Sequence, residues 1–209
     1  MIRLYHRLTS GNSYKVRLLL SILQLEYEGV AVELERGRNK VDEAYLRLNP
    51  RGQIPTLVDD ELVLWGSTAI LFYLAGKYDT GQRWLPAEVG AASEIMQWLE
   101  LAQNECNSGL FLARAIRRFG YEGDLATALR DGRKALDVLE ARLRDREWLV
   151  LQRATIADLA CFPYAALAGE GGFQLSDWPA VRSWIGRIGE LEGFIGMPGI
   201  AGPKSISAG

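Results

Sequence analysis

The stretch NPRGQIPTLVDDELVLWGSTAILFYL, residues 49–74, decides the fold. Asn49 precedes Pro50, which pushes it out of the helical region, so a short helix predicted over 41–48 ends there. Ile54 and Pro55 stand directly before a strand, a position typical of a cis X-Pro turn that leaves the Ile54 backbone free to pair with an extended peptide. The apolar runs 56–58 and 62–64 flank three acidic residues and predict a hairpin, which a helix over 67–78 follows.

Upstream of this stretch, the pattern predicts a β-α-β unit. Ile2 and Leu4 alternate with less apolar neighbours, as in a half-buried strand. A helical face follows at Val16, Leu19, Leu20 and Leu23, and a second alternating strand carries Val30, Val32 and Leu34. The order β-α-β-α-β-β-α thus ends near residue 80, and residues 81–87 have the composition of a linker.

From residue 88 onward, the periodicity is helical throughout. One apolar face carries Ile95, Trp98, Leu99, Ala102 and Cys106, a second carries Leu125, Leu129, Leu136, Leu139 and Leu143, and a last one carries Val181, Trp184, Ile185 and Ile188. Thr155 and Asp158 are spaced as in a capping box. The tail 198–209, rich in Gly, Ser and Pro, is either disordered or covers a surface cleft. The sequence therefore predicts an α/β domain, residues 1–80, a linker, residues 81–87, and an all-α domain, residues 88–209.

The composition excludes several classes of function. A formal net charge of −2, without a long block of like charge, argues against a nucleic-acid partner. Cys106 and Cys161 lack the spacing of a zinc site or dithiol centre, so we expect no metal and two core cysteines. The longest apolar run, residues 69–75, is far shorter than a membrane span of about 20 residues, and no secretory segment begins the chain. We therefore expect a cytoplasmic protein without a membrane partner.

Several segments together resemble the soluble glutathione transferase superfamily. They are SGNSYKVR at residues 10–17, NPRGQIP at 49–55, STAI at 67–70, WLP at 84–86 and TIADL at 155–159. EGG at residues 170–172 and WPAVR at 178–182 are similar to a bacterial, theta-related group. The resemblance covers nearly the whole chain. It implies a thioredoxin-like N-terminal domain that binds glutathione, an all-helical C-terminal domain that contributes the site for an electrophile, and a homodimer.

The catalytic requirement implied by this resemblance is modest. Glutathione carries its own thiol and needs only a larger thiolate fraction than a free pKa of about 8.5 permits. By the resemblance, Ser10 at the end of the first strand donates its hydroxyl to the sulfur, with Ser13 as the alternative and Asn12 assisting. Either serine can instead cap the following helix, and for Ser13 that interpretation is favoured.

Other residues are expected to hold the tripeptide. Ser67 begins a helix, so its hydroxyl and the free N–H groups of the first turn suit the γ-glutamyl carboxylate. Gln53 is expected to hydrogen-bond the tripeptide. Lys40 either neutralises the glycine carboxylate or is an ordinary solvated lysine. The residues predicted to bind glutathione, which acts as co-substrate, are Ser10, Lys40, Gln53, Ile54, Pro55, Ser67 and Thr68.

One position departs from the family pattern. Family members commonly have Glu, Gln or Asp just before the motif serine, where it contacts the γ-glutamyl amine, whereas this chain has Gly66. Glycine supplies no such contact, so either the affinity for glutathione is reduced or another group replaces it.

The second substrate is expected to lie between the domains, with Asn104, Asn107, Phe111 and Arg114 as candidates or, alternatively, as ordinary helix surface or core. Arg114, Arg117 and Arg118 either favour an acidic substrate or form a solvated face.

The resemblance implies an enzyme of detoxification: a transferase that activates the glutathione thiol for attack on a small hydrophobic electrophile. Peroxidase, dehalogenase and isomerase activities are chemical variants on the same site. A non-catalytic binding protein for glutathione or hydrophobic ligands, and a protein-interaction module, are the alternatives.

Overall fold

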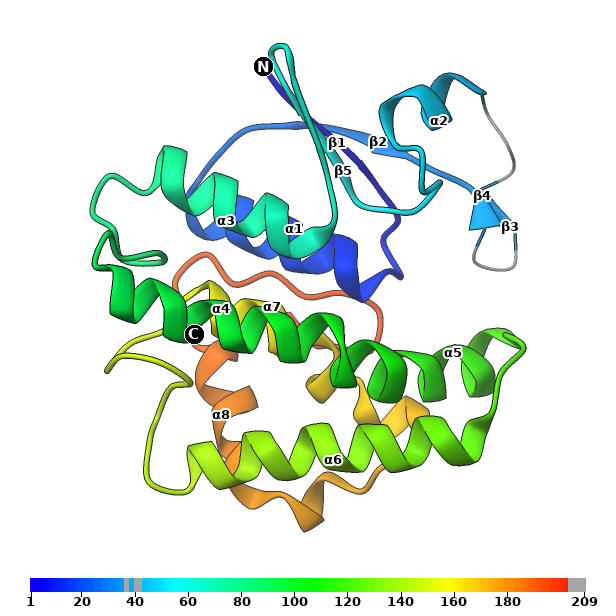
Figure 1. The fold of residues 1–209 in the computed structure, drawn as a ribbon, viewed down its shortest axis with the longest axis vertical. Coiled ribbons are helices and arrows are strands. Elements are labelled where there is room, and N and C mark those ends of the chain that lie inside the picture. The colour runs from blue at the N-terminus through cyan, green and yellow to red at the C-terminus, as the bar shows by residue number, and fades with distance from the viewer. Residues whose placement is uncertain (36–37, 40–42, 203–209) are drawn as a thin grey trace, which may run out of the picture.

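The computed structural model describes residues 1–35, 38–39 and 43–202. The N-terminal domain holds a four-stranded sheet of order β2-β1-β5-β6, with α1 and α3 side by side on one face (Figure 1). Its elements are β1 (Ile2–His6), α1 (Gly11–Ile22), β2 (Glu28–Ala31), β3 (Leu34–Glu35), β4 (Arg38–Asn39), α2 (Glu43–Leu48), β5 (Thr56–Asp59), β6 (Leu62–Trp65) and α3 (Ser67–Tyr78). β1 runs parallel to β2 and antiparallel to β5, which forms the predicted hairpin with β6. The mixed α/β class predicted for this domain is confirmed.

The second strand differs from its prediction. Alternation through Leu34 predicted one long strand, whereas β2 ends at Ala31 and Leu34 belongs to β3, which forms a separate two-stranded sheet with β4. β2 is an edge strand with three of its four residues exposed. Burial on one face therefore does not fix its limits as it would for an inner strand.

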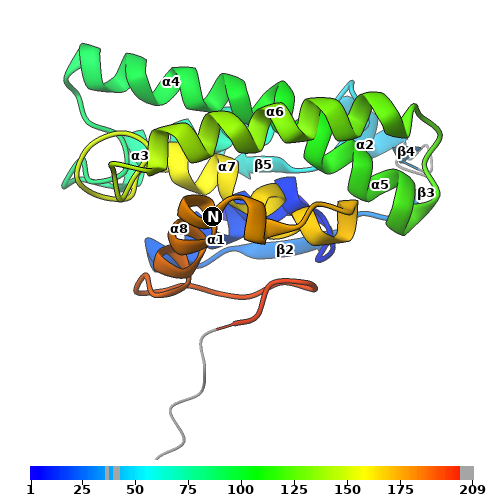
Figure 2. The same ribbon diagram turned by 90° about the horizontal axis from the view of Figure 1, so that it is seen from below.

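The C-terminal domain is helical, as predicted. Its elements are α4 (Val89–Gln103), the π-helical segment η1 (Cys106–Phe111), α5 (Leu112–Phe119), α6 (Leu125–Leu143), α7 (Ile156–Ala166), the 3-10 turns η2 (Ala168–Gly171) and η3 (Leu175–Asp177), and α8 (Pro179–Gly189). α7 lies at the centre, because it packs against α1 and α3 of the first domain and against α4, η1 and α8 of its own. Figure 2 shows the chain leaving α8 and running along the edge of the molecule, where Ile195 accepts a 2.6 Å hydrogen bond from Tyr14.

A buried carboxylate fixes the start of α7. Asp158 accepts hydrogen bonds from the backbone N–H groups of Thr155 and Leu149 and from the indole of Trp184, at 2.9 to 3.1 Å. The Thr155 hydroxyl accepts in turn from the first turn of α7, so the predicted capping box is confirmed. Asp158 thereby joins α7, the loop before it and α8.

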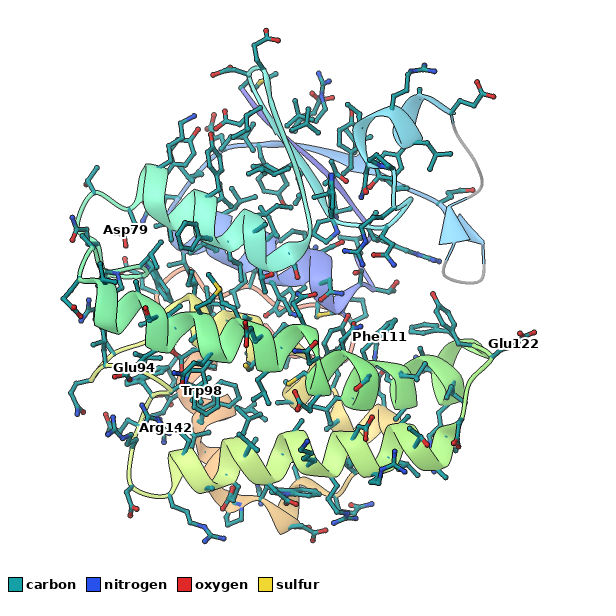
Figure 3. The ribbon with its side chains drawn as sticks, in the orientation of Figure 1. Asp79, Glu94, Trp98, Phe111, Glu122 and Arg142 are labelled. Carbon is teal, nitrogen blue, oxygen red and sulfur yellow. The ribbon has the colours of Figure 1, made fainter. Side chains whose placement is uncertain are left out.

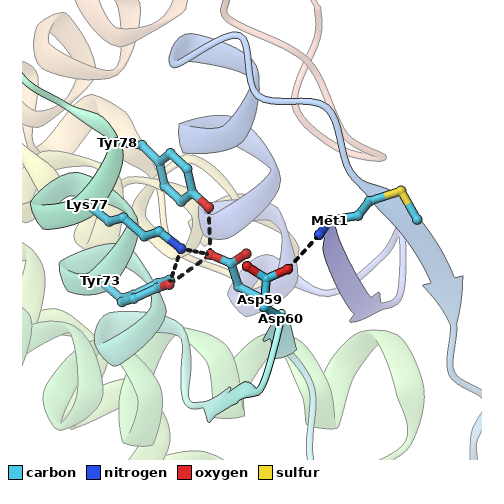
Figure 4. A network of polar contacts seen from close by, with 6 residues as sticks. All are labelled: Met1, Asp59, Asp60, Tyr73, Lys77 and Tyr78. Carbon is cyan, nitrogen blue, oxygen red and sulfur yellow. Dashed lines mark hydrogen bonds and ion pairs between the residues drawn. The ribbon is translucent and has the colours of Figure 1, made fainter.

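A second carboxylate ties the hairpin to α3. Asp59, at the end of β5, accepts hydrogen bonds on one oxygen from Tyr73, Lys77 and Tyr78 at 2.6 to 2.7 Å (Figure 4). Burial raises the pKa of Asp59, but these three donors outweigh it and lower the pKa to about 2. The neighbouring Asp60 pairs with the N-terminal amine of Met1, also drawn in Figure 4.

One lysine is buried where the two domains meet. Lys15 on α1 is fully buried, and its Nζ has no hydrogen-bond partner within the described residues. The Nζ lies 5.2 Å from the ring centre of Tyr164 and close to the thiols of Cys106 and Cys161. Burial lowers the pKa of Lys15 from 10.5 to about 8. A hydrogen bond between the two thiols, together with burial, raises the pKa of Cys161, so both cysteines belong to the core, as predicted.

Two glycines allow η1 and α6 to cross closely. A methyl group on Gly109 of η1 would overlap the backbone of Gly132 on α6, and one on Gly132 would overlap the ring of Phe173. Both positions therefore require a residue without a side chain. Their contact places η1, which carries Asn107 and Phe111, directly against α6.

Candidate functional site

A cleft of about 450 Å³ lies between the two domains. The loop after β1, the loop before β5 and the start of α3 line its N-terminal side, and the end of α4, η1, α5 and α7 line its helical side. Figure 3 shows Phe111 at this junction, on the helical side and facing the sheet domain. The cleft thus brings together residues that are up to 157 positions apart, Arg7 and Tyr164.

The loop before β5 is held by buried hydrogen bonds. Asn49 donates to the carbonyl of Gln53 at 2.6 Å and to the Thr56 hydroxyl at 3.0 Å, and Tyr45 donates to the same carbonyl at 2.7 Å. The Ile54-Pro55 bond is cis, as predicted. Gln53, Ile54 and Pro55 all line the cleft.

Ser10 stands at the start of α1, on the wall of the cleft. Its Oγ accepts a 3.2 Å hydrogen bond from the backbone of Ser13, so it is the N-cap of the helix. A hydroxyl has two lone pairs and one proton, so this cap leaves the Ser10 proton free to be donated. Ser13 is fully buried outside the cleft, where its Oγ accepts a hydrogen bond from Arg7 N–H at 3.5 Å.

A polar chain crosses the cleft at the start of α3. The Ser67 hydroxyl donates to Asn12 Oδ1 at 3.4 Å and accepts from Gln103 Nε2 at 3.3 Å. It therefore connects α1, α3 and α4. Gly66 caps α3 without a side chain and has φ +91° and ψ 120°, in a region that L residues rarely adopt. A Cβ placed on Gly66 would meet no atom within 4 Å, so the space beside this position is open.

Aromatic rings line the helical end of the cleft. Phe111 packs edge-on to Tyr121, with ring centres 6.2 Å apart, and lies 5.3 Å from Tyr164. Burial raises the pKa of Tyr164, so its hydroxyl stays protonated and accepts a hydrogen bond from the Asn12 backbone. Phe119 completes this wall and is 44% exposed.

Arg114 joins this aromatic end to the loop that carries Ser10. Its side chain is 4% exposed, and its Nε donates to Glu170 at 2.8 Å while Nη1 donates to the carbonyl of Thr9 at 3.3 Å. The ion pair compensates the charge of Arg114, and the contact with Thr9 ties the first loop to the helical domain.

The structure brings together most of the residues predicted from the sequence. Those that line the cleft are Ser10, Asn12, Gln53, Ile54, Pro55, Ser67, Asn107, Phe111 and Arg114. Ser13, Thr68 and Asn104 do not line it, and Lys40 lies outside the described residues. Asn104 ends α4, and its neighbour Gln103 faces the cleft instead.

Sequence reasoning missed other residues of the lining, among them Arg7, Arg51, Trp65, Gln103, Phe119, Tyr121 and Tyr164. The guanidinium of Arg51 lies 5.6 Å from the ring centre of Trp65, beside the predicted glutathione-binding loop. Across residues 1–35, 38–39 and 43–202, no three His, Cys, Asp or Glu side chains gather as metal ligands would. Nor does the same part of the chain contain a helix of the length and apolarity needed to cross a membrane.

Fold and cleft define a thioredoxin-like domain joined to a helical domain, with a hydroxyl at a helix start facing the cleft between them. Residues 1–76 match the family model "Glutathione S-transferase, N-terminal domain", and residues 104–192 match "Glutathione S-transferase, C-terminal domain". Glutathione S-transferase 2 of Schizosaccharomyces pombe is 33% identical, over 83% of this chain and 80% of that protein. The chain belongs to the glutathione S-transferase family.

Solved structures agree with this assignment. A glutathione S-transferase from Pseudomonas fluorescens superposes with a TM-score of 0.85 and 34% identity, over 93% of this chain and 97% of that one. A glutathione transferase homologue from Lodderomyces elongisporus, solved with two GSH per subunit, superposes with a TM-score of 0.81 and 26% identity, over 92% and 94% of the two chains.

Proposed function

We propose that this chain joins the thiolate of glutathione to a small electrophile, with the Ser10 hydroxyl as donor to the sulfur. The observation that carries the proposal is Ser10 itself, which lies on the cleft wall at the start of α1 with its proton free. The first turn of a helix also favours a negative charge nearby. Both effects lower the pKa of a thiol bound there, and Asn12 supplies a further amide donor.

Glutathione itself is held by the N-terminal domain in this proposal. Ser67 and the free N–H groups at the start of α3, among them the backbone N–H of Thr68, whose side chain does not line the cleft, bind the γ-glutamyl carboxylate. The Ile54 backbone pairs with the peptide. Gln53 and Lys40 contribute to the rest of the tripeptide. The L. elongisporus relative, whose structure contains GSH, supports glutathione as the ligand.

Calorimetric titration with glutathione, followed by conjugation to 1-chloro-2,4-dinitrobenzene, tests the proposal. Binding and turnover are expected. Binding without turnover would favour a ligand carrier, and absence of binding would favour a protein-interaction module.

Ser10→Ala is expected to lower conjugation by about one to two orders of magnitude, the effect of removing one hydrogen bond to a charged group. Ser13→Ala is the matched control, because both changes remove one hydroxyl from the first turn of α1. Loss in Ser13→Ala with near-normal turnover in Ser10→Ala would transfer the role to Ser13.

We further propose a cytoplasmic homodimer with domain limits at residues 1–80 and 88–209. Exposed apolar side chains support an interface: Trp65 on β6, Phe72 on α3 and Met96 on α4 are each 42–45% exposed. The end of α3 at Tyr78 and the start of α4 at Val89 support the linker at residues 81–87. Light scattering at micromolar concentration that gave the monomer mass of 23.3 kDa would contradict the dimer.

A further inference from the structure

The charges around the cleft are unequal. Three arginines line it, Arg7, Arg51 and Arg114, and no aspartate or glutamate does so within the described residues. Glu170 compensates Arg114 from behind. Arg51 and Arg7 therefore face the cleft without a compensating carboxylate among the described residues. Arg51 lies beside Gln53 and Trp65, at the end assigned to glutathione, and Arg7 lies beside Tyr121, at the aromatic end.

Arg7 lies at the aromatic end, beyond the residues assigned to glutathione. It follows β1 in the loop that carries Ser10, and its positive charge acts on Tyr121, whose pKa burial raises and Arg7 lowers. The Arg7 guanidinium makes no ion pair or side-chain hydrogen bond to any residue that the structure describes. A cation without a protein partner on the wall of a cleft is suited to an anionic ligand.

The rings beside Arg7 select the rest of that ligand. Phe111, Phe119, Tyr121 and Tyr164 form one wall, and Phe119 is 44% exposed, with the Arg114 guanidinium 4.9 Å from the centre of its ring. Such a wall favours a flat, conjugated group that can stack on it or meet ring edges. Arg117 and Arg118 take no part, because neither lines the cleft.

We propose that the second substrate is a planar aromatic electrophile that carries a carboxylate, bound with its ring against the aromatic wall and its anion at Arg7. This inference rests on the proposed transferase function and names the acceptor class. In the reaction, the glutathione sulfur forms a bond to the ring carbon that bears a halide. The halide leaves with the electrons of its bond, and the thiol proton passes to solvent. No oxidant or reductant is required.

The test compares 4-chloro-3-nitrobenzoate with its methyl ester, which has a similar ring without the charge. Each kcat/KM is divided by the uncatalysed rate with glutathione, so that intrinsic reactivity cancels. We expect the corrected acid-to-ester ratio to exceed one and to fall about tenfold in Arg7→Met, the scale of one charge-assisted hydrogen bond. Arg130→Met, which removes the same charge from the exposed surface of α6, should leave the ratio unchanged.

A binding measurement separates this inference from the proposed function. Calorimetry with the two finished conjugates, one a carboxylate and one a methyl ester, needs no turnover. Tighter binding of the carboxylate conjugate, lost in Arg7→Met, supports the inference even where the protein catalyses nothing. A preference for the ester, or a ratio that Arg7→Met does not change, overturns the inference. The proposed transferase function still stands in that case if the protein conjugates glutathione.

Discussion

Replacing the buried Lys15 with methionine should stabilise the protein at neutral pH. The lysine is fully buried without a hydrogen-bond partner among the described residues, and its pKa falls from 10.5 to about 8. At about 1.36 kcal/mol per unit, this shift corresponds to a penalty of about 3 kcal/mol for keeping the proton in the folded state. Methionine has a similar length and no charge, so Lys15→Met should remove most of that penalty.

The effect has a defined pH dependence. Below pH 8 the lysine is protonated in both folded and unfolded chains, so wild type carries the full penalty. Between pH 8 and 10.5 the folded protein releases the proton while the unfolded chain keeps it, so wild-type stability rises relative to the variant. The difference between the two proteins should therefore be largest at pH 7 and should close toward pH 10.5.

Thermal unfolding followed by circular dichroism measures this difference. At pH 7 the variant should melt about 6–12 °C above wild type, because about 1 kcal/mol shifts Tm by about 2–4 °C in a chain of this size. Lys134→Met on α6, whose side chain is 68% exposed, is the control and should change stability by less than about 0.5 kcal/mol. A destabilised Lys15→Met, or a difference that widens with pH, would refute the reasoning.

Three further changes test other parts of the structure. Asp59→Asn should lower the free energy of unfolding by about 1–3 kcal/mol above pH 4. This difference from wild type should become smaller as the pH falls toward 2, because Asp59 itself becomes protonated there. Urea unfolding at pH 5 and pH 2.5 measures the difference. Gly66→Glu should lower thermal stability by about 1–3 kcal/mol because of its positive φ, yet tighten glutathione binding by about 1–2 kcal/mol at low salt, as calorimetry and circular dichroism can determine. Glu170→Gln removes the charged partner of the buried Arg114 and should lower the free energy of unfolding, measured with urea, by about 1–3 kcal/mol.

Sequence patterns correctly predicted the helices and strands whose ends depend on neighbouring residues. Asn49 and Pro50 end α2, and the acidic turn after Asp59 forms the predicted hairpin. Thr155 and Asp158 form the predicted capping box because both partners lie within one turn of helix. Each of these features depends on residues within a few positions of one another, which is the range that sequence patterns report.

The features that were missed depend on packing between domains. α1 is enclosed by α3 and α7, so nine of its twelve residues are buried and a one-sided helical pattern could not reveal Lys15. Arg7, Tyr121 and Tyr164 meet in the cleft only because the helical domain packs against the first loop. α4 ends at Gln103, which faces the cleft, while Asn104 is the C-cap and lies outside the cleft lining.

η1 and α6 cross in direct backbone contact at Gly109 and Gly132, behind the end of the cleft assigned to the acceptor. Because the backbones touch there, the position of Phe111 depends on α6, the long outer helix, rather than on the glutathione domain. A methyl group at Gly109 would overlap the backbone of α6 and must push η1 away from it, moving Phe111 with it, whereas one at Gly132 would displace the ring of Phe173. The width available to the acceptor is therefore set by atoms that neither substrate touches.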